Sequence, residues 1–196
     1  RLPNVDDIPK IDPGFRTDPE NYFPYERDSE TLARAWVKPG TPGLEHRVGG
    51  LEKDQLTGDV SYDPENHETM VRLREEKIQK IADDVASAEV EGAQEGDLLV
   101  VGWGGTYGAI KQGVAAHTAN GKKVGHLHLR WLNPLPNGLT DIFKRYKKVL
   151  VCELNRGQLW RHLRAECLVP AEKYTKVQGL PFKVSEIKAA IETHLA

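Results

Sequence analysis

The chain has 196 residues, of which 39% are hydrophobic and 29% charged. This length supports one core of moderate size with an appendage, because domains usually contain about 100–200 residues. Lysine and arginine number 27 against 29 aspartates and glutamates, so the formal net charge of −2 argues against a broad basic field for nucleic acid or for an acidic membrane surface.

The cysteines and the apolar runs narrow the class of protein further. Cys152 and Cys167 are the only cysteines and form no C-x-x-C motif, so this chain cannot build a disulfide framework, a zinc site or an iron–sulfur cluster from cysteines. No apolar run approaches about 18 residues, and the first ten residues lack the order of a secretory signal. We therefore expect a cytoplasmic protein without a membrane span, and the initial Arg in place of Met favours a fragment.

The first forty residues predict an extended arm. Prolines recur at a density that excludes helices and central strands. The arm is nevertheless too apolar for a free tail, so we expect it to pack on the body of the protein or to drive self-association. Its large apolar side chains are Leu2, Ile8, Phe15, Tyr22, Phe23, Tyr25 and Trp36.

A long helix is predicted after Asp63. Asp63 can act as N-cap, Pro64 suits the first helical position, and Glu65 suits the positive end of the helix dipole. An apolar stripe continues the helical pattern to about Ala88. It consists of Val71, Ile78, Ile81 and Val85.

From Asp97 onward the sequence alternates between strand and helix patterns. Strands are expected at 97–104, 123–132, 147–154 and 174–180, and helices at 106–121, 139–146, 157–168 and 184–195, the last capped by Ser185. Alternation of this kind implies right-handed crossovers between parallel strands. The predicted fold class is α/β, a three-layer, mainly parallel sheet with helices on both faces, preceded by the arm and the long helix.

In such sheets ligands lie beyond the carboxyl ends of the strands, and the loop after the first strand offers Gly102, Gly104, Gly105 and Thr106. An anion or a nucleotide could bind to N–H groups there. The glycine spacing differs from the dinucleotide fingerprint, so a tight structural turn is the favoured interpretation. An independent nucleotide- or anion-binding module remains the alternative function.

The loop after the third strand has two interpretations as well. Asn155 and Gln158 have the spacing of a capping box, and the same two residues could contact an anion or a partner. Capping of the helix terminus is the favoured interpretation of both residues.

Two further residue types, histidine and cysteine, could act as metal ligands. His126 and His128 share one face of a strand at a spacing that can hold zinc, but without a third ligand nearby, packing under a helix is favoured. Cys152 and Cys167 are expected to be small core residues. We expect no metal site in this chain.

The stretch from Thr41 to His67 is rich in glycine and charge. Glu45 and His46 could form an acid–base pair, yet adjacent residues of an extended segment point in opposite directions, and no nucleophile stands at a triad-like position. Composition alone favours a surface loop, and we expect no catalytic residue in this chain.

Longer motifs carry a family resemblance. "GTPGLEHRVGGLEKDQLTGDVSYDPENHETMVRLREEKI", "VVGWGGTYGAIKQ", "GKKVGHLHLRWLNPLP" and "VLVCELNRGQL" resemble alpha subunits of 2-oxoacid:ferredoxin oxidoreductases, most closely the 2-oxoglutarate type. The first motif is similar to the linker that follows the thiamine-diphosphate pyrimidine domain, and the others are similar to the C-terminal domain, itself similar to that of transketolase. The resemblance covers essentially the whole chain.

The resemblance implies a division of the chain and a set of partners. Residues 1–62 would be the arm and linker from a missing pyrimidine-side domain, and residues 63–196 the α/β C-terminal domain with its leading helix. The family implies oxidative decarboxylation of a 2-oxoacid to an acyl-CoA with thiamine diphosphate and Mg, an iron–sulfur cluster and coenzyme A, none of which is expected in this chain. A beta subunit would be the partner, ferredoxin would be reached through the complex, and the isolated chain would be inactive and self-associate.

The resemblance also places three linker residues at a subunit interface. Glu45, His46 and Arg47 are interface candidates, with substrate or coenzyme A contact as the weaker alternative. Relatives often carry an acid where this chain has Arg47, and Asp54 stands where the family pattern has an acid without an evident physical reason.

Overall fold

The computed structural model describes residues 2–196. By their internal contacts these residues form two units, one ending at Lys80 and one from Ile81 to Ala196. The boundary expected from the sequence, at residue 62, stays a prediction. No helix among residues 2–196 is long and apolar enough to cross a membrane.

The first unit is mostly irregular chain followed by one long helix. Among its described residues before α1, Pro64–Lys80, the regular structure consists of a short 3₁₀ turn, Val5–Asp7, and three isolated bridges. Leu44 and Met70 are its only buried hydrophobic residues among those described. The arm therefore lacks a core of its own, as its proline content predicts.

Helix α1 begins where the sequence indicates but ends earlier. Asp63 Oδ1 accepts hydrogen bonds from the N–H groups of Glu65, at 2.8 Å, and Asn66, which confirms the N-cap. The predicted end near Ala88 is wrong, since a 3₁₀ turn, Ile81–Asp83, follows Lys80 directly. Val71 and Ile78, on the apolar stripe, are 44% and 40% exposed.

The second unit contains a five-stranded sheet in the order β1-β3-β2-β4-β5. The strands are β1 Val90–Gly92, β2 Gly96–Trp103, β3 Val124–Leu129, β4 Tyr146–Glu153 and β5 Glu172–Thr175. All neighbours pair in parallel except β1, which is antiparallel to β3. Strand β1 was missed because three residues are too few to show a period. The predicted strand at 174–180 lies too late, since Val177 and Leu180 are exposed after β5 ends.

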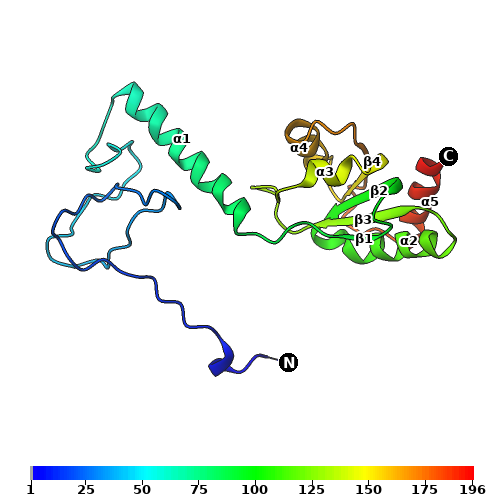
Figure 1. Cartoon of the computed structure of the whole chain (residues 1–196), viewed down its shortest axis with the longest axis horizontal. Helices are drawn as coiled ribbons and strands as arrows, with labels where there is room; N and C mark the ends of the chain where they lie inside the picture. Colours follow the sequence, from blue (N-terminus) through cyan, green and yellow to red (C-terminus); the bar gives the residue numbers. More distant parts are fainter. Residues whose placement is uncertain (1) are drawn as a thin grey trace. The chain divides into compact units, whose positions relative to one another are not determined.

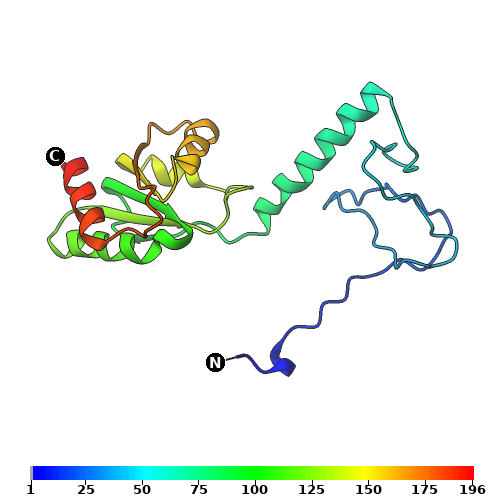
Figure 2. The same ribbon diagram turned by 180° about the vertical axis from the view of Figure 1, so that it is seen from behind.

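Four helices cover the two faces of this sheet. They are α2 Tyr107–Ala119, α3 Leu139–Phe143, α4 Gln158–Glu166 and α5 Val184–Leu195. Helices α3 and α4 share one hydrophobic cluster with the strands, and α2 and α5 share the other. Figure 1 shows α3 and α4 across the strands from α2, and Figure 2 shows α5 beside α2 from behind. The three-layer prediction is confirmed.

Burial explains why the central strands read as continuous apolar runs. Residues 98–101 of β2 are 0% exposed because helices cover both faces. Helices α2 and α5 approach closely at Gly113, where a Cβ would lie 2.6 Å from Ile187 Cγ2.

Ser185 is not the cap of α5. Glu186 accepts a hydrogen bond from the Lys183 N–H instead, at 2.7 Å, and also pairs with the buried Lys176.

Candidate functional site

The loop after β2 is a packed structural turn. Gly102 lies under α2, and a Cβ there would overlap Ile110 Cδ1 and come within 2.5 Å of Thr106 Oγ1. Thr106 is buried, and its hydroxyl accepts from the Trp103 N–H at 3.0 Å and donates to the Trp103 carbonyl at 2.9 Å. These contacts account for Gly102 and Thr106 without a ligand.

The other two glycines of the loop have a different role. Gly104 has φ +56°, which favours glycine, and nothing lies within 4 Å of a Cβ placed on Gly104 or Gly105. They allow the chain to turn from β2 into α2. Packing thus accounts for Gly102 and Thr106, and the positive φ angle accounts for Gly104.

The loop after β4 is organised by a residue that the sequence analysis did not single out. Glu153 is the last residue of β4 and is fully buried. Its carboxylate accepts hydrogen bonds from Leu159 N–H and Trp160 N–H at 2.9 Å each, from Asn155 Nδ2 at 3.0 Å and from Trp103 Nε1 at 3.2 Å. A carboxylate at a helix N-terminus complements the free N–H groups and the dipole.

Asn155 completes this arrangement, but not as half of a capping box. Its Oδ1 accepts from the N–H groups of Gly157 and Gln158, at 2.7 and 3.0 Å. Gly157, with φ +89°, is the residue that precedes α4, and no reciprocal side-chain bond from Gln158 occurs among the described residues. The capping-box prediction is wrong in detail, because Glu153 takes the deeper N–H groups.

These contacts decide whether a phosphate group fits at the start of α4. The N–H groups of Gln158, Leu159 and Trp160 already donate to Asn155 and Glu153. A pyrophosphate such as that of thiamine diphosphate or coenzyme A would meet a buried carboxylate in the same place. The residues at this turn therefore do not fit a phosphate group, and the turn is not an anion-binding site.

A second polar cluster lies between β1, β3 and α2. Glu91 Oε1 accepts from the Tyr107 hydroxyl at 2.6 Å, and Lys111 Nζ lies 3.2 Å from Glu91 Oε2. The Tyr107 ring contacts His126 and His128 with centroids 5.5 and 5.0 Å apart. The hydrogen bond from Tyr107 is the main cause that lowers the pKa of Glu91.

The two histidines are held as neutral rings on the sheet. Burial lowers the pKa of His126 to about 4 and also lowers the pKa of His128. No group of three metal-ligating side chains is present in the part of the chain that the structure describes. The packing interpretation of His126 and His128 agrees with this placement.

A cavity of 530 Å³ opens beside this cluster. Glu91, Tyr107, His128, Arg130 and Trp131 are among its lining residues. Charges of both signs line the cavity, so its chemistry selects neither a cation nor an anion.

The two cysteines lie in different environments. Cys152 is 0% exposed in β4, and burial raises the pKa of its thiol to about 12. Cys167 is partly buried against the cluster of α3 and α4. Both packing predictions agree with these positions.

The linker candidates Glu45, His46 and Arg47 of the first unit differ in exposure. Glu45 and Arg47 are exposed and have no ion pair among the residues described. The Nδ1 atom of His46 lies 3.1 Å from the Tyr22 hydroxyl and 3.0 Å from the Leu44 carbonyl oxygen. His46 is thus tied to the arm, whereas Glu45 and Arg47 are exposed.

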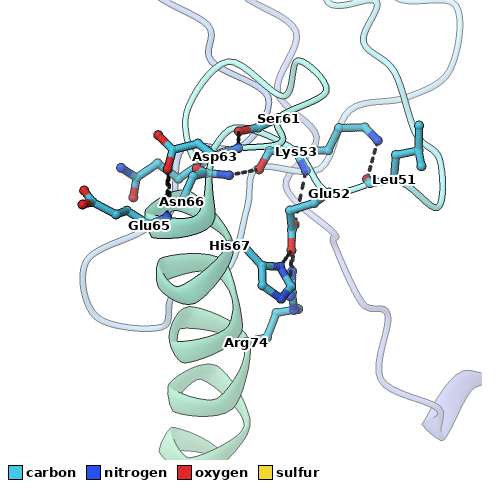
Figure 3. Close-up of polar contacts among 10 residues, drawn as sticks. Leu51, Glu52, Lys53, Ser61, Asp63, Glu65, Asn66, His67 and Arg74 are labelled. Carbon is cyan, nitrogen blue, oxygen red and sulfur yellow. Dashed lines mark hydrogen bonds and ion pairs between the residues drawn. The ribbon is translucent and has the colours of Figure 1, made fainter.

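A stronger network, missed from the sequence, anchors the linker to α1. Glu52 Oε2 lies 2.8 Å from His67 Nδ1 and 3.1 Å from Arg74 Nη2, and Figure 3 shows the three side chains together. The hydrogen bond from Arg74 is the largest cause that lowers the pKa of Glu52 to about 2. The spacing of Glu52 from Arg74 carries no local pattern, so sequence reasoning had no signal for it.

Two neighbouring residues fix the turn that presents Glu52. Lys53 is 2% exposed and donates through Nζ to the Leu51 carbonyl at 2.6 Å, also visible in Figure 3. Asp54 Oδ1 accepts from the N–H groups of Leu56 and Thr57, at 2.9 and 2.8 Å. The acid after Leu-Glu-Lys therefore has a physical reason, which is to close a turn.

Comparison with known proteins places these features in a family. Residues 96–188 match the family model of the pyruvate:ferredoxin oxidoreductase core domain II. The 2-oxoglutarate oxidoreductase subunit KorA of Mycobacterium tuberculosis is 46% identical over 197 residues, which cover 100% of this chain and 30% of the relative. The chain belongs to the 2-oxoacid:ferredoxin oxidoreductase family.

Other members of the family agree with this assignment. The 2-oxoglutarate synthase subunit KorA of Methanocaldococcus jannaschii is 28% identical over 76% of this chain and 40% of its own length. The structure of 2-oxoglutarate:ferredoxin oxidoreductase from Magnetococcus marinus, with 2-oxoglutarate, coenzyme A and succinyl-CoA bound, aligns with a TM-score of 0.90 and 32% identity. That alignment covers 99% of this chain and 34% of the other.

Two outcomes follow for the sequence-based interpretation. The resemblance to alpha subunits of 2-oxoacid:ferredoxin oxidoreductases is confirmed, and the independent nucleotide-binding module is not favoured. The chain spans about a third of the length of the first curated relative and of the solved structure.

Proposed function

We propose that this chain is the structural and assembly part of the alpha subunit of a 2-oxoglutarate:ferredoxin oxidoreductase. The observation that carries the proposal is the 46% identity over the whole chain to a 2-oxoglutarate oxidoreductase subunit. The full complex would convert a 2-oxoacid, coenzyme A and oxidised ferredoxin to an acyl-CoA, carbon dioxide and reduced ferredoxin in the cytoplasm. Thiamine diphosphate with Mg and an iron–sulfur cluster would supply the decarboxylation and electron transfer when bound.

The α/β unit is suited to a supporting role. Glu153 and Thr106 carry the reactive side chains at the strand ends. Both side chains are already used in hydrogen bonds within the fold. A rigid scaffold of this kind holds neighbouring loops in place without touching substrate. In this proposal the reacting groups belong to other parts of the complex, and the isolated chain is inactive.

The first unit supports assembly with a partner. Its arm exposes large apolar side chains while burying almost none. Exposed apolar surface of this extent is typical of regions covered by another protein. Large exposed side chains in the arm and linker include Leu2, Ile11, Phe15, Trp36, Val48, Leu51 and Tyr62.

We further propose that the beta subunit is this partner and that Glu45 and Arg47 pair with its charges. Both side chains are exposed, and the contacts of His46 and Glu52 hold the linker beside them in one conformation. Without the beta subunit the same apolar arm would drive self-association of the chain. Ferredoxin would then be contacted by the complex rather than by this chain.

The test is co-purification of the chain with its beta subunit after supply of the remaining alpha-subunit sequence. We expect a stable complex that reduces a low-potential acceptor in the presence of 2-oxoglutarate and coenzyme A, and no turnover by the 196-residue chain alone. The double variant Glu45→Gln, Arg47→Gln should weaken subunit binding about tenfold (~1.4 kcal/mol), whereas Lys38→Gln, also exposed, should not. Turnover of a ketoacid by the chain alone, or no association with the beta subunit, would contradict the proposal.

A further inference from the structure

The His126 ring is buried without a hydrogen-bond partner. His126 is 1% exposed, and neither of its ring nitrogens has a partner among the residues described. The Nδ1 atom of His128 is buried and unpaired as well. A neutral imidazole carries one donor and one acceptor, and leaving them unpaired in the interior costs free energy. His126 is therefore a buried polar side chain whose hydrogen-bonding capacity the closed sheet leaves unused.

The surrounding charges come from three elements. Strand β1 supplies Glu91, which lies opposite His126 in the β1–β3 register and has its Oε2 4.0 Å from His126 Nδ1. Helix α2 supplies Tyr107 and Lys111, both of which bind the Glu91 carboxylate. His128 faces the same ring on β3, its centroid 5.9 Å away.

Arg130 is the remaining charged group of the cluster. It follows β3 and acts against a positive charge on His128. Lys111 and His128 likewise disfavour a positive charge on His126, whereas Glu91 favours it. Because Glu91 is already shared by Tyr107 and Lys111, it offsets only part of the burial of a charged ring.

We propose that this cluster is a proton-sensitive latch, in which protonation of His126 releases β1 from β3. Strand β1 is the right size for such a release, since it forms only three residue pairs and stands at the sheet edge. It also follows the segment that leads from α1 into the sheet. Opening of β1 lengthens that connection and uncovers the histidines. Acid would therefore lengthen the segment between α1 and the sheet.

The linkage between protonation and opening gives a magnitude. In the closed state burial holds the pKa of His126 at about 4, against 6.5 for a solvated ring. The open state therefore binds the proton more tightly, and acid favours opening. Between pH 7 and pH 5 these two pKa values raise the opening equilibrium about 20-fold.

Hydrogen exchange of the whole chain tests the latch. Protection factors, corrected for the intrinsic pH dependence of exchange, should fall about 20-fold between pH 7 and pH 5 at the β1–β3 amides. The variant His126→Phe keeps an aromatic ring but cannot take up a proton. Its protection factors should fall less than about threefold over the same pH range. The matched control His117→Phe removes another buried histidine, one that bonds the Gly113 carbonyl, and should behave like the wild type.

A second measurement covers the case in which His126→Phe does not fold. An NMR titration of the wild-type histidine rings should show His126 still neutral at pH 5 in the closed state. Equal loss of protection in wild type and His126→Phe would overturn the latch. Titration of His126 near pH 6.5 with β1 still protected would overturn it as well, because the ring would then take up a proton without opening.

Discussion

The carboxylate of Glu153 accepts a hydrogen bond from the indole Nε1 of Trp103 at 3.2 Å, and this contact joins the ends of two adjacent parallel strands. The same carboxylate terminates β4 and caps α4. One buried side chain thereby fixes the geometry of both strand-end loops. The contact therefore couples the end of β2 to the start of α4.

Replacement of Glu153 by Gln should destabilise the α/β unit by about 2–3 kcal/mol. One carboxylate oxygen would become an NH₂ group facing N–H donors, and those donors would lose their acceptor inside the protein. Urea unfolding followed by tryptophan fluorescence measures the change. Glu166→Gln, at the exposed end of α4, is the matched control and should stay within about 0.5 kcal/mol of the wild type. Equal stability of both variants would show that the cap carries little free energy.

Asn155 should contribute less than Glu153 to the same turn. Asn155→Ala removes the acceptor of the Gly157 and Gln158 N–H groups, and Gln158 is exposed. We expect a loss of about 1 kcal/mol in the free energy of unfolding, the usual cost of a lost cap. Thermal and urea unfolding measure it, and an unchanged melting temperature would favour a role for Asn155 at an interface over its role in the turn.

Two glycines near the start of α2 should respond to alanine in opposite directions. Gly102→Ala places a methyl group against Ile110 and Thr106, so we expect a loss of about 1–3 kcal/mol. Gly108→Ala adds a methyl group in open space on a helical residue and should be neutral or stabilise by about 0.5 kcal/mol. Denaturant unfolding of both variants compares them directly. A large loss of unfolding free energy in Gly108→Ala would instead indicate that a group outside this chain packs against Gly108.

Much of the α/β unit was predictable from the sequence because burial leaves a local signal there. The apolar runs of β2 and β4 and the periodicity of α2 and α5 each fixed an element and its buried face. Short edge strands such as β1 leave no such signal. The end of α1 was also unpredictable, because the apolar stripe continues past Lys80 although the α-helix ends there.

The candidate site was harder to predict than the fold. The glycines and Thr106 were predicted as turn residues, whereas Glu153 was passed over inside a strand pattern. Its role depends on α4, six residues further along, and on Trp103, fifty residues earlier. Contacts of that separation arise from the fold and not from any spacing in the sequence.

The anchor of the linker should weaken in acid. Because the pKa of Glu52 is lowered in the folded chain, its pairing stabilises the linker above the ordinary value of 4.5 and is lost as the pH falls towards about 2. Arg74→Met should raise the pKa of Glu52 towards 4.5 and move this loss to higher pH. Arg72→Met removes an exposed arginine that pairs with Glu68 and should leave Glu52 unchanged. NMR titration of the Glu52 carboxyl group in the three proteins measures the shift. If Arg74→Met left the Glu52 titration where it was, the hydrogen bonds from His67 and from the Lys53 N–H would have to account for the low pKa.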